Sequence, residues 1–361
     1  MASWADGSAA DFRDFLNRVC DFAFGEVCRY SPAVRIVRDA VNPMEFYDEE
    51  DFSLRFRFTK ASVIAIMSEL QLKKNTDRRG TPLPPLLKVL ITLRFYGTGA
   101  MQTVVGDLVR VSQQYVSRCV WEITKVICLR LFPKYVRLPD AADANAVMAR
   151  FYAIGLFLGV TGCIDCTHVP IVSPGGENPE VFRNRKGYFS LNVQQNITNS
   201  RVMALYEQKA VPGVLLGDQG YACLPFLMTP LKNPQTRAEK RYNKSQIKTR
   251  NSVERTFGVW KRRFACLRVK LLTDTDRSAA IITACAVLHN IACLRRDPCP
   301  LSDEAHPDVN LPDNPSQRDP DTVAGAQVHS CYIRRIKASL EFYVECVLQQ
   351  RQPASADIPH T

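Results

Sequence analysis

The chain has 361 residues, of which 46% are hydrophobic and 23% charged, and its net charge is +11. This composition is typical of a soluble globular protein, and no apolar run approaches the roughly 18 residues of a membrane-spanning helix. Thirteen cysteines, in a sequence that begins without a signal-peptide pattern, indicate reduced core thiols of an intracellular protein, not a short secreted disulfide scaffold. The positive charge favours a polyanion such as nucleic acid, although a merely basic protein explains it equally well.

The first region, residues 1–85, is predicted to be helical and to end in a linker. Aromatic-rich helical segments are expected at 12–24 and 60–70. The polar, proline-rich run KKNTDRRGTPLPP follows at 73–85. Proline and glycine in such a run end regular structure, so we place a domain boundary there.

Residues 86–150 are predicted to form an all-α helix-turn-helix domain that binds DNA. An apolar face at helical spacing starts near Leu87, and the glycines at 97 and 99 close that helix. A shorter apolar segment follows, and Ser112 is a favourable N-cap for a long helix. This order of helices outlines a helix-turn-helix, although a bundle that serves only packing has the same outline. The residues expected to read base edges open the long helix: Gln113, Gln114, Ser117 and Arg118.

Residues 153–296 are predicted to form a mixed α/β domain. GLFLGVTGCIDCTHVPIV, YFSLNVQQNI and PGVLLGDQGY have the β-branched or alternating patterns of strands. Helical patterns return in ACLPFLMTPL, in the basic segment around Glu254 and in SAAIITACAVLHNIACLRR. Strands followed by helices indicate one α/β domain. The apolar run at 151–160 is expected in its core.

The C-terminal part of the chain is predicted to consist of a linker and a helix. Residues 297–328 are rich in Pro, Asp and Ser, which is typical of a disordered linker. Residues 329–361 are expected to hold an amphipathic helix between 332 and 350, followed by a tail. This helix would dock onto the protein or onto a partner.

Three acidic residues stand where a carboxylate is costly. Asp165 lies within the apolar run GCIDCTHV, Asp218 closes VLLGD, and Glu254 lies on the basic helix. Three converging carboxylates need divalent cations to neutralise them, and oxygen ligands suit Mg²⁺ or Mn²⁺. Two such ions about 3.5–4 Å apart can activate a water and stabilise the leaving oxygen of a phosphodiester. The alternative, which spacing alone favours, is three unconnected acids: a capping Asp, a turn Asp and a surface Glu.

The helix around Glu254 lies in the densest basic stretch of the chain. Val253, Phe257 and Trp260 repeat at helical spacing as a buried stripe, and Gly258 leaves room beside Glu254. The basic side chains are expected to hold a DNA backbone against the metal ions, or else to form a solvated helix face. They are Arg250, Arg255, Lys261, Arg262 and Arg263, with Arg237, Lys240, Arg241, Lys244 and Lys248 upstream.

Other residues near these acids have two interpretations. Cys163 and Cys166 flank Asp165 as C-x-x-C, but residues three apart on a strand face opposite sides, which favours core thiols over a zinc site. His168 is expected either to touch a metal-bound water or phosphate or to support the local turn. The basic residues at 183, 185 and 186 either contact phosphate or lie in a solvated loop. His289, on an apolar helix, is interpreted as a core residue.

The motifs GCIDCTHVPI, FRNRKGYFSLNVQ, LLGDQGYACLPFLMTPL, RYNKSQIKTRNSVERTFGVWKRRFACL and CAVLHNIA occur in the order of the PIF/Harbinger transposase family. The chain resembles this family and its transposase-derived nucleases over residues 86–296. The resemblance implies an RNase H-like mixed sheet flanked by helices, preceded by a helix-turn-helix. It implies a DDE endonuclease site with Asp165 on the first strand, Asp218 ending a later strand and Glu254 on a helix.

The resemblance also implies cofactors, partners and location. The expected cofactor is a divalent cation, Mg²⁺ or Mn²⁺. The expected partners are DNA and a Myb-like DNA-binding protein, with no membrane and no indicated oligomeric state. The expected location is the nucleus and cytoplasm.

One segment departs from the family pattern. After SLNVQ the family continues into a second antiparallel strand and a Trp-Pro-Gly-Ser-like turn, whereas this chain passes from Gln194 to Val214 without that hairpin. A lost edge strand would shift Asp165 relative to Asp218, and an error of about 1 Å can reduce catalysis on the order of 100-fold. The alternative function is therefore a catalytically impaired, domesticated DNA-binding or adaptor protein.

Overall fold

The structure is a computed structural model, which describes residues 42–72, 83–107, 111–139, 141–176, 179–194 and 201–298. Three groups of predictions lie wholly or mainly outside these residues. They concern the helix at 12–24, the linker at 73–85, and the linker and C-terminal helix beyond residue 298.

Three short helices open the described chain: α2 (Pro43–Phe46), α3 (Glu49–Phe56) and α4 (Lys60–Leu70). Asp48 and Thr59 cap α3 and α4, each side chain accepting the backbone N–H three residues further on. The helix expected at 60–70 is confirmed.

Four helices follow: α5 (Pro85–Thr98), α6 (Gln102–Asp107), α7 (Gln113–Arg130) and α8 (Phe132–Tyr135). Gly99 ends α5 in the left-handed conformation, with φ at 63°, which glycine adopts without a Cβ clash. The side chain of Ser112 accepts the backbone N–H of Tyr115 and caps α7. The predicted order of helices, and both of these end signals, are confirmed.

Helix α9 (Ala141–Gly155) leads through a turn into the first strand, β1 (Val160–Cys163). The prediction that the whole run 151–160 lies in the core is wrong. The side chains of Leu156 and Leu158 are 64% and 76% exposed. The helix ends at Gly155 and Leu156 adopts a φ of 61°, so these apolar residues form an exposed turn between α9 and β1.

The other strands are β2 (Cys166–Pro170), β3 (Ser190–Gln194), β4 (Val214–Leu216) and β5 (Leu227–Met228). Among the described residues, a parallel sheet has the order β1-β4-β5 and an antiparallel pair joins β2 to β3. Only two residues separate β1 from β2, and Asp165 is one of them. The predicted mixed α/β fold is confirmed: helices predominate and the sheets are small.

The segment ACLPFLMTPL was predicted to be helical, and this is wrong. It contains β5 between turns, with Pro225 and Pro230 close to the strand ends. The backbone N–H of Leu215 donates to the carbonyl of Phe226 at 2.7 Å. Strand β5 thus satisfies the backbone groups of β4 that do not pair with β1. Pairing with a distant strand therefore outweighs the local helical pattern.

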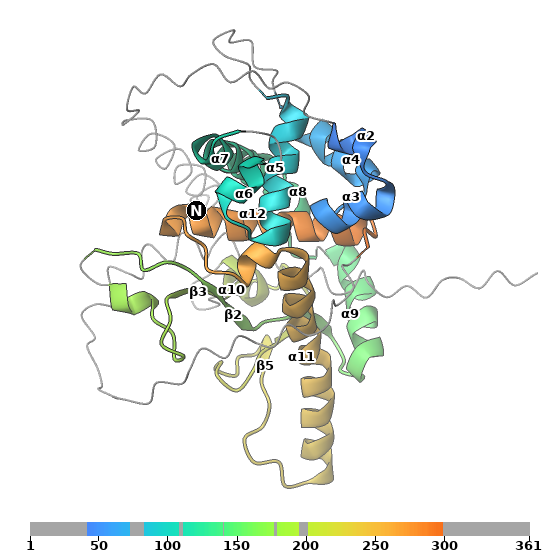
Figure 1. Cartoon of the computed structure of the whole chain (residues 1–361). Helices are drawn as coiled ribbons and strands as arrows, with labels where there is room; N and C mark the ends of the chain where they lie inside the picture. The colour runs from blue at the N-terminus through green and yellow to red at the C-terminus, as the bar shows by residue number, and fades with distance from the viewer. Residues whose placement is uncertain are drawn as a thin grey trace, which may run out of the picture.

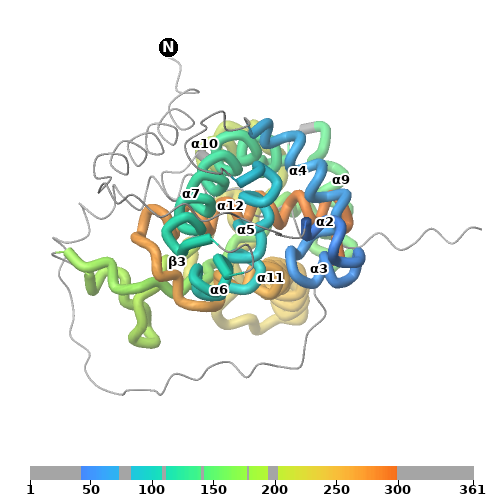
Figure 2. Tube along the Cα trace, turned by 45° about the horizontal axis from the view of Figure 1, so that its top comes forward, coloured from blue at the N-terminus to red at the C-terminus, as the bar shows by residue number. Residues whose placement is uncertain are grey.

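The remaining elements are η1 (Pro179–Phe182), α10 (Arg201–Glu207), α11 (Arg237–Arg263), η2 (Ala265–Leu267) and α12 (Thr275–Leu294). Figure 1 shows α12 crossing the middle of the molecule, between helices α4–α8 and the strands. In the turned view of Figure 2, α5, α6 and α7 again gather over α12. By length and composition α12 could cross a membrane, but it is buried inside the protein, as expected of a core helix.

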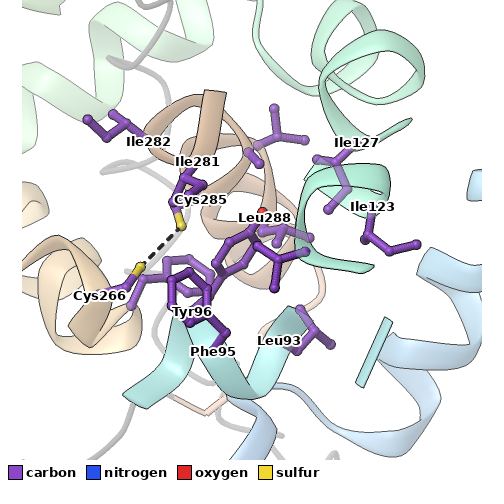
Figure 3. Close-up of a cluster of buried hydrophobic side chains, with 14 of the residues drawn as sticks. Leu93, Phe95, Tyr96, Ile123, Ile127, Cys266, Ile281, Ile282, Cys285 and Leu288 are labelled. Atoms are coloured by element: carbon purple, nitrogen blue, oxygen red, sulfur yellow. Dashed lines mark hydrogen bonds between the residues drawn. The ribbon is translucent and has the colours of Figure 1, made fainter. Parts of the chain in front are cut away.

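The largest core cluster joins the N-terminal helices to the C-terminal ones. In Figure 3, Tyr96 of α5 and Ile127 of α7 pack with Leu288 of α12. The Sγ atoms of Cys266 and Cys285 lie 3.9 Å apart in the same cluster. The helical region thus shares apolar packing with α12, while the domain boundaries at 85 and 150 stay predictions.

Candidate active site

Asp165 and Asp218 follow the carboxyl ends of two neighbouring parallel strands. Strand β1 pairs with β4 in a register that places Cys163 beside Leu216. The backbone N–H of Ile164 donates to the carbonyl of Leu216 at 2.8 Å. Each aspartate is the second residue after its strand, so both lie at the same edge of the sheet, as the sequence predicts.

Glu254 is linked to Asp165 by a single guanidinium. Arg250 Nη1 lies 2.8 Å from Asp165 Oδ2, and Arg250 Nη2 lies 2.8 Å from Glu254 Oε1. Arg250 was predicted to contact DNA. It pairs with two of the three acids and its side chain is only 13% exposed, and its contact with DNA stays a prediction. The i,i+4 spacing to Glu254 could have indicated one of these ion pairs, but nothing local indicates the other.

The pKa of Asp165 is influenced by the other two acids. Burial raises its pKa, and the negative charges of Asp218 and Glu254 act in the same direction. The backbone N–H of Cys166, which donates to Asp165 Oδ1 at 2.8 Å, and the Arg250 guanidinium oppose that rise. Two carboxylates therefore lie close enough to Asp165 to disfavour its charged form.

Helix α11 is fixed against the sheet by its buried polar face. Gln246 Nε2 donates to the carbonyl of Gly217 at 2.7 Å, next to Asp218. Ser245 Oγ donates to the carbonyl of Gly155 at 2.5 Å. A Cβ at Gly155 would clash with the hydroxyl of Thr249, so the glycine permits this close approach. These contacts fix the position of α11, and so of Glu254, relative to both aspartates. The sequence did not indicate the role of Gln246.

The apolar stripe and the glycine predicted on α11 are confirmed. Val253 and Trp260 are buried, Phe257 packs against the core, and a Cβ at Gly258 would meet no atom within 4 Å. Open space therefore lies beside the helix one turn beyond Glu254.

The chemistry of the site residues suits a divalent cation. Among the described residues, no three His, Cys, Asp or Glu side chains are close enough together to hold a metal ion. The positive charge between Asp165 and Glu254 is instead that of Arg250, whose buried Nε has no hydrogen-bond partner in the described part of the chain. Two carboxylates that already converge on one cation have the charge and donor chemistry for Mg²⁺ or Mn²⁺, so the residues fit.

The other predicted DNA contacts on α11 differ in exposure. Arg255 and Arg262 are exposed. Lys261 is partly buried, its Nζ donates to the carbonyl of His168 at 2.7 Å, and burial lowers its pKa to about 8. The prediction that Arg263 contacts DNA is wrong. Its side chain is 1% exposed and donates to the carbonyls of Arg57, Asp297 and Pro298.

The predicted base-reading residues lie at the start of α7. Gln113, Gln114 and Arg118 are exposed, and Ser117 is partly exposed. Val116 faces the core and is fully buried. The predicted base-reading residues thus lie on α7, on one side of α12. The three carboxylates lie on the other side of α12, where the strands are (Figure 1).

The flanking cysteines have different environments. Cys163 is buried and Cys166 is exposed, so the core-thiol prediction holds for Cys163 and is wrong for Cys166. His168 Nδ1 lies 2.9 Å from Ser190 Oγ on the paired strand. His289 is buried in α12 with Nε2 3.6 Å from Cys293 Sγ, which confirms its interpretation as a core residue.

The loop before β3 is partly structural. Arg183 forms an ion pair with Glu180 and donates to the carbonyl of Gly187 at 2.6 Å. These contacts support the loop and leave Arg185 and Lys186 exposed.

Comparison with known proteins places the chain among transposase-related nucleases. A family described as "DDE superfamily endonuclease" matches residues 195–290, a range that includes Asp218 and Glu254 but not Asp165. The human protein named "Putative nuclease HARBI1" is 35% identical over 243 residues, covering 60% of this chain and 69% of that protein. Its Xenopus laevis counterpart is 31% identical, covering 59% and 69%. "Protein ALP1-like" of Arabidopsis thaliana is 23% identical, covering 60% and 62%. No solved structure matches the chain significantly.

Proposed function

This chain belongs to the family of Harbinger transposase-derived DDE nucleases, and we propose that it hydrolyses DNA phosphodiester bonds at Asp165, Asp218 and Glu254. One observation carries the proposal. Acids that lie 89 residues apart in the chain share one guanidinium, and the third acid follows the adjacent strand. Carboxylates brought together at one point repel one another, and a cation between them relieves that repulsion.

In this proposal the three carboxylates would hold divalent cations, with Arg250 giving up at least one of its ion pairs. The ions would supply the activation of a water and the stabilisation of the leaving oxygen. Arg250, once released, would be free to donate to the scissile phosphate from the same position. Gln246 would hold Asp218 at a fixed distance from α11, because its side chain donates to the carbonyl of Gly217.

The fold proposed for this site is RNase H-like. Strands β1 and β2 would be one strand interrupted at Asp165, paired in parallel with β4 on one part and antiparallel with β3 on the other. Helices α5, α6 and α7 would form the helix-turn-helix, with Gln113, Gln114 and Arg118 at the exposed start of the recognition helix. No described residue points to the Myb-like partner.

The test is cleavage of a duplex that carries a terminal repeat, with Mg²⁺ or Mn²⁺. We expect Asp165→Asn and Glu254→Gln to reduce cutting by on the order of 100-fold or more, because each removes a metal-binding charge. Mn²⁺ binding, measured by calorimetry, should weaken in both variants. We expect Arg250→Gln to bind Mn²⁺ more tightly than the unaltered protein, because a competing internal cation is lost. Cutting that persists in both acid variants would refute the assignment.

A second candidate function is DNA binding without catalysis. It is favoured by the short connection between β3, which ends at Gln194, and α10, which starts at Arg201. Six residues are too few for the family's second hairpin strand and its turn. Tight DNA binding with no cutting in either cation would support this candidate over the nuclease.

A further inference from the structure

Six basic side chains lie in one row along α11, apart from the carboxylates. Their spacings are four, three, four, seven and seven residues. At 3.6 residues per turn they fall within about 60° of one another around the helix axis. All six are exposed: Arg237, Arg241, Lys244, Lys248, Arg255 and Arg262. We name these residues the basic row.

The basic row faces a different direction from the active site. Arg250, Glu254, Gly258 and Lys261 also share one face of α11, because they are separated by four, four and three residues. That face is turned by about 100° from the basic row. The basic row and the face that carries Glu254 are therefore two neighbouring faces of the same helix.

The charge of the basic row is uncompensated. Helix α11 carries ten basic and two acidic residues, a net charge of +8 in a chain whose total is +11. Glu239 completes the N-terminal capping box and Glu254 pairs with Arg250, so neither neutralises the row. None of its six members has an ion-pair partner among the described residues. A solvated helix face usually mixes both signs, because like charges one turn apart repel.

The start of α11 projects from the body of the molecule. No residue between Arg237 and Lys244 is buried, and Figure 1 shows this end of α11 extending away from the strands beside the loop that leads into it. The ring of Tyr242 contacts Phe157, and the side chain of Asn243 bonds the backbone of Leu231. At 1.5 Å per residue, the row from Arg237 to Arg262 is about 37 Å long. That length is close to one turn of a DNA duplex, about 34–36 Å.

We propose that the basic row binds the phosphate backbone of a DNA duplex beside the bond that is cut. The choice of DNA rests on the proposed function, since the adjacent carboxylates would act on the same molecule. The contact is with phosphates and is independent of base sequence, because guanidinium and ammonium groups repeated along about 37 Å of one helix face match a line of backbone charges. Binding by the row and cutting by the carboxylates are separable, because they use different faces of α11.

The experiment uses the full chain and a fluorescein-labelled duplex of arbitrary sequence, about three helical turns long, without divalent cations. Binding is measured by anisotropy across a salt series. The test variant combines Arg237→Gln, Arg241→Gln and Lys244→Gln, at exposed positions where glutamine is a good helix former. The matched control loses the same charge elsewhere, through Lys209→Gln, Arg268→Gln and Lys270→Gln, all exposed.

We expect the test variant to bind at least about tenfold more weakly, and its slope of log affinity against log salt to fall by about 3, one for each lost phosphate contact. The control should change the slope by less than 1, and both variants should keep the thermal midpoint of the unaltered protein. Equal losses in both variants, or no loss in the test variant, would overturn the proposal. An RNA duplex of the same length that binds more than tenfold tighter would overturn the choice of DNA.

The same variants separate this inference from the proposed function. If the unaltered protein cuts nothing but the test variant loses DNA binding, the basic row stands and the nuclease proposal fails. If the unaltered protein cuts DNA and the test variant binds and cuts equally well, the nuclease stands and the basic row fails.

Discussion

Helix α11 contains two regions with opposite environments. In its first part, Arg237–Lys244, no side chain is buried. In its second part, from residue 245 to 263, seven side chains are buried, including Trp260 and Arg263. The helix is continuous and basic throughout, so its charge does not distinguish the two parts. The difference shows that tertiary packing holds Glu254 in place, while the charges of the projecting part face solvent.

Amide hydrogen exchange should show the largest contrast between these two parts. Amides between Val253 and Trp260 open only with the core, whereas those between Arg241 and Lys244 need only the end of a helix to fray. We expect protection factors to differ by on the order of a thousandfold or more. Exchange measured by mass spectrometry on the free protein gives both values. Equal protection in the two parts would mean that the projecting part is packed in solution.

The neighbours Arg262 and Arg263 sharpen the comparison within the second part. Arg263→Gln should lower the free energy of unfolding by about 3 kcal/mol, because three carbonyls lose a charged donor in a buried site. Arg262→Gln, at an exposed position, should change it by less than about 0.5 kcal/mol. Urea unfolding measures both. In DNA binding the order should reverse, with Arg262→Gln lowering the salt slope by about 1.

The pH dependence of stability gives a smaller effect, at Lys261. Burial lowers its pKa to about 8 in the folded protein from an ordinary value of 10.5. Between these values the unfolded chain holds the proton and the folded chain does not, so stability rises with pH. We expect a gain on the order of 2 kcal/mol between pH 8 and 10.5.

Two methionine variants assign this pH effect, one at Lys261 and a matched control at Lys244. Lys261→Met should lose the gain, because the titrating group is gone. Lys244→Met, in the projecting part, should keep it. A gain that is equal in all three proteins would assign the effect to other groups.

Sequence reasoning identified much of this protein from local patterns. The apolar spacing and the caps Ser112 and Gly99 predicted α5 and α7, and the pattern PGVLLGDQGY predicted β4 before Asp218. These signals are local, because capping and periodicity depend on neighbours within one turn or strand. The same patterns failed at β5, where pairing with β4 decided the outcome, and at Leu156 and Leu158, which lie in an exposed turn.

The sequence alone determined which acids are candidates, that α11 is a basic helix, and that its cations repeat at helical spacing. Only the tertiary structure decided that Arg250 pairs with Asp165, that Arg263 is buried beside an exposed Arg262, and that the start of α11 projects. The physical reason is that spacing specifies the direction of a side chain around its own helix. What meets the side chain in that direction is supplied by residues far away in the chain.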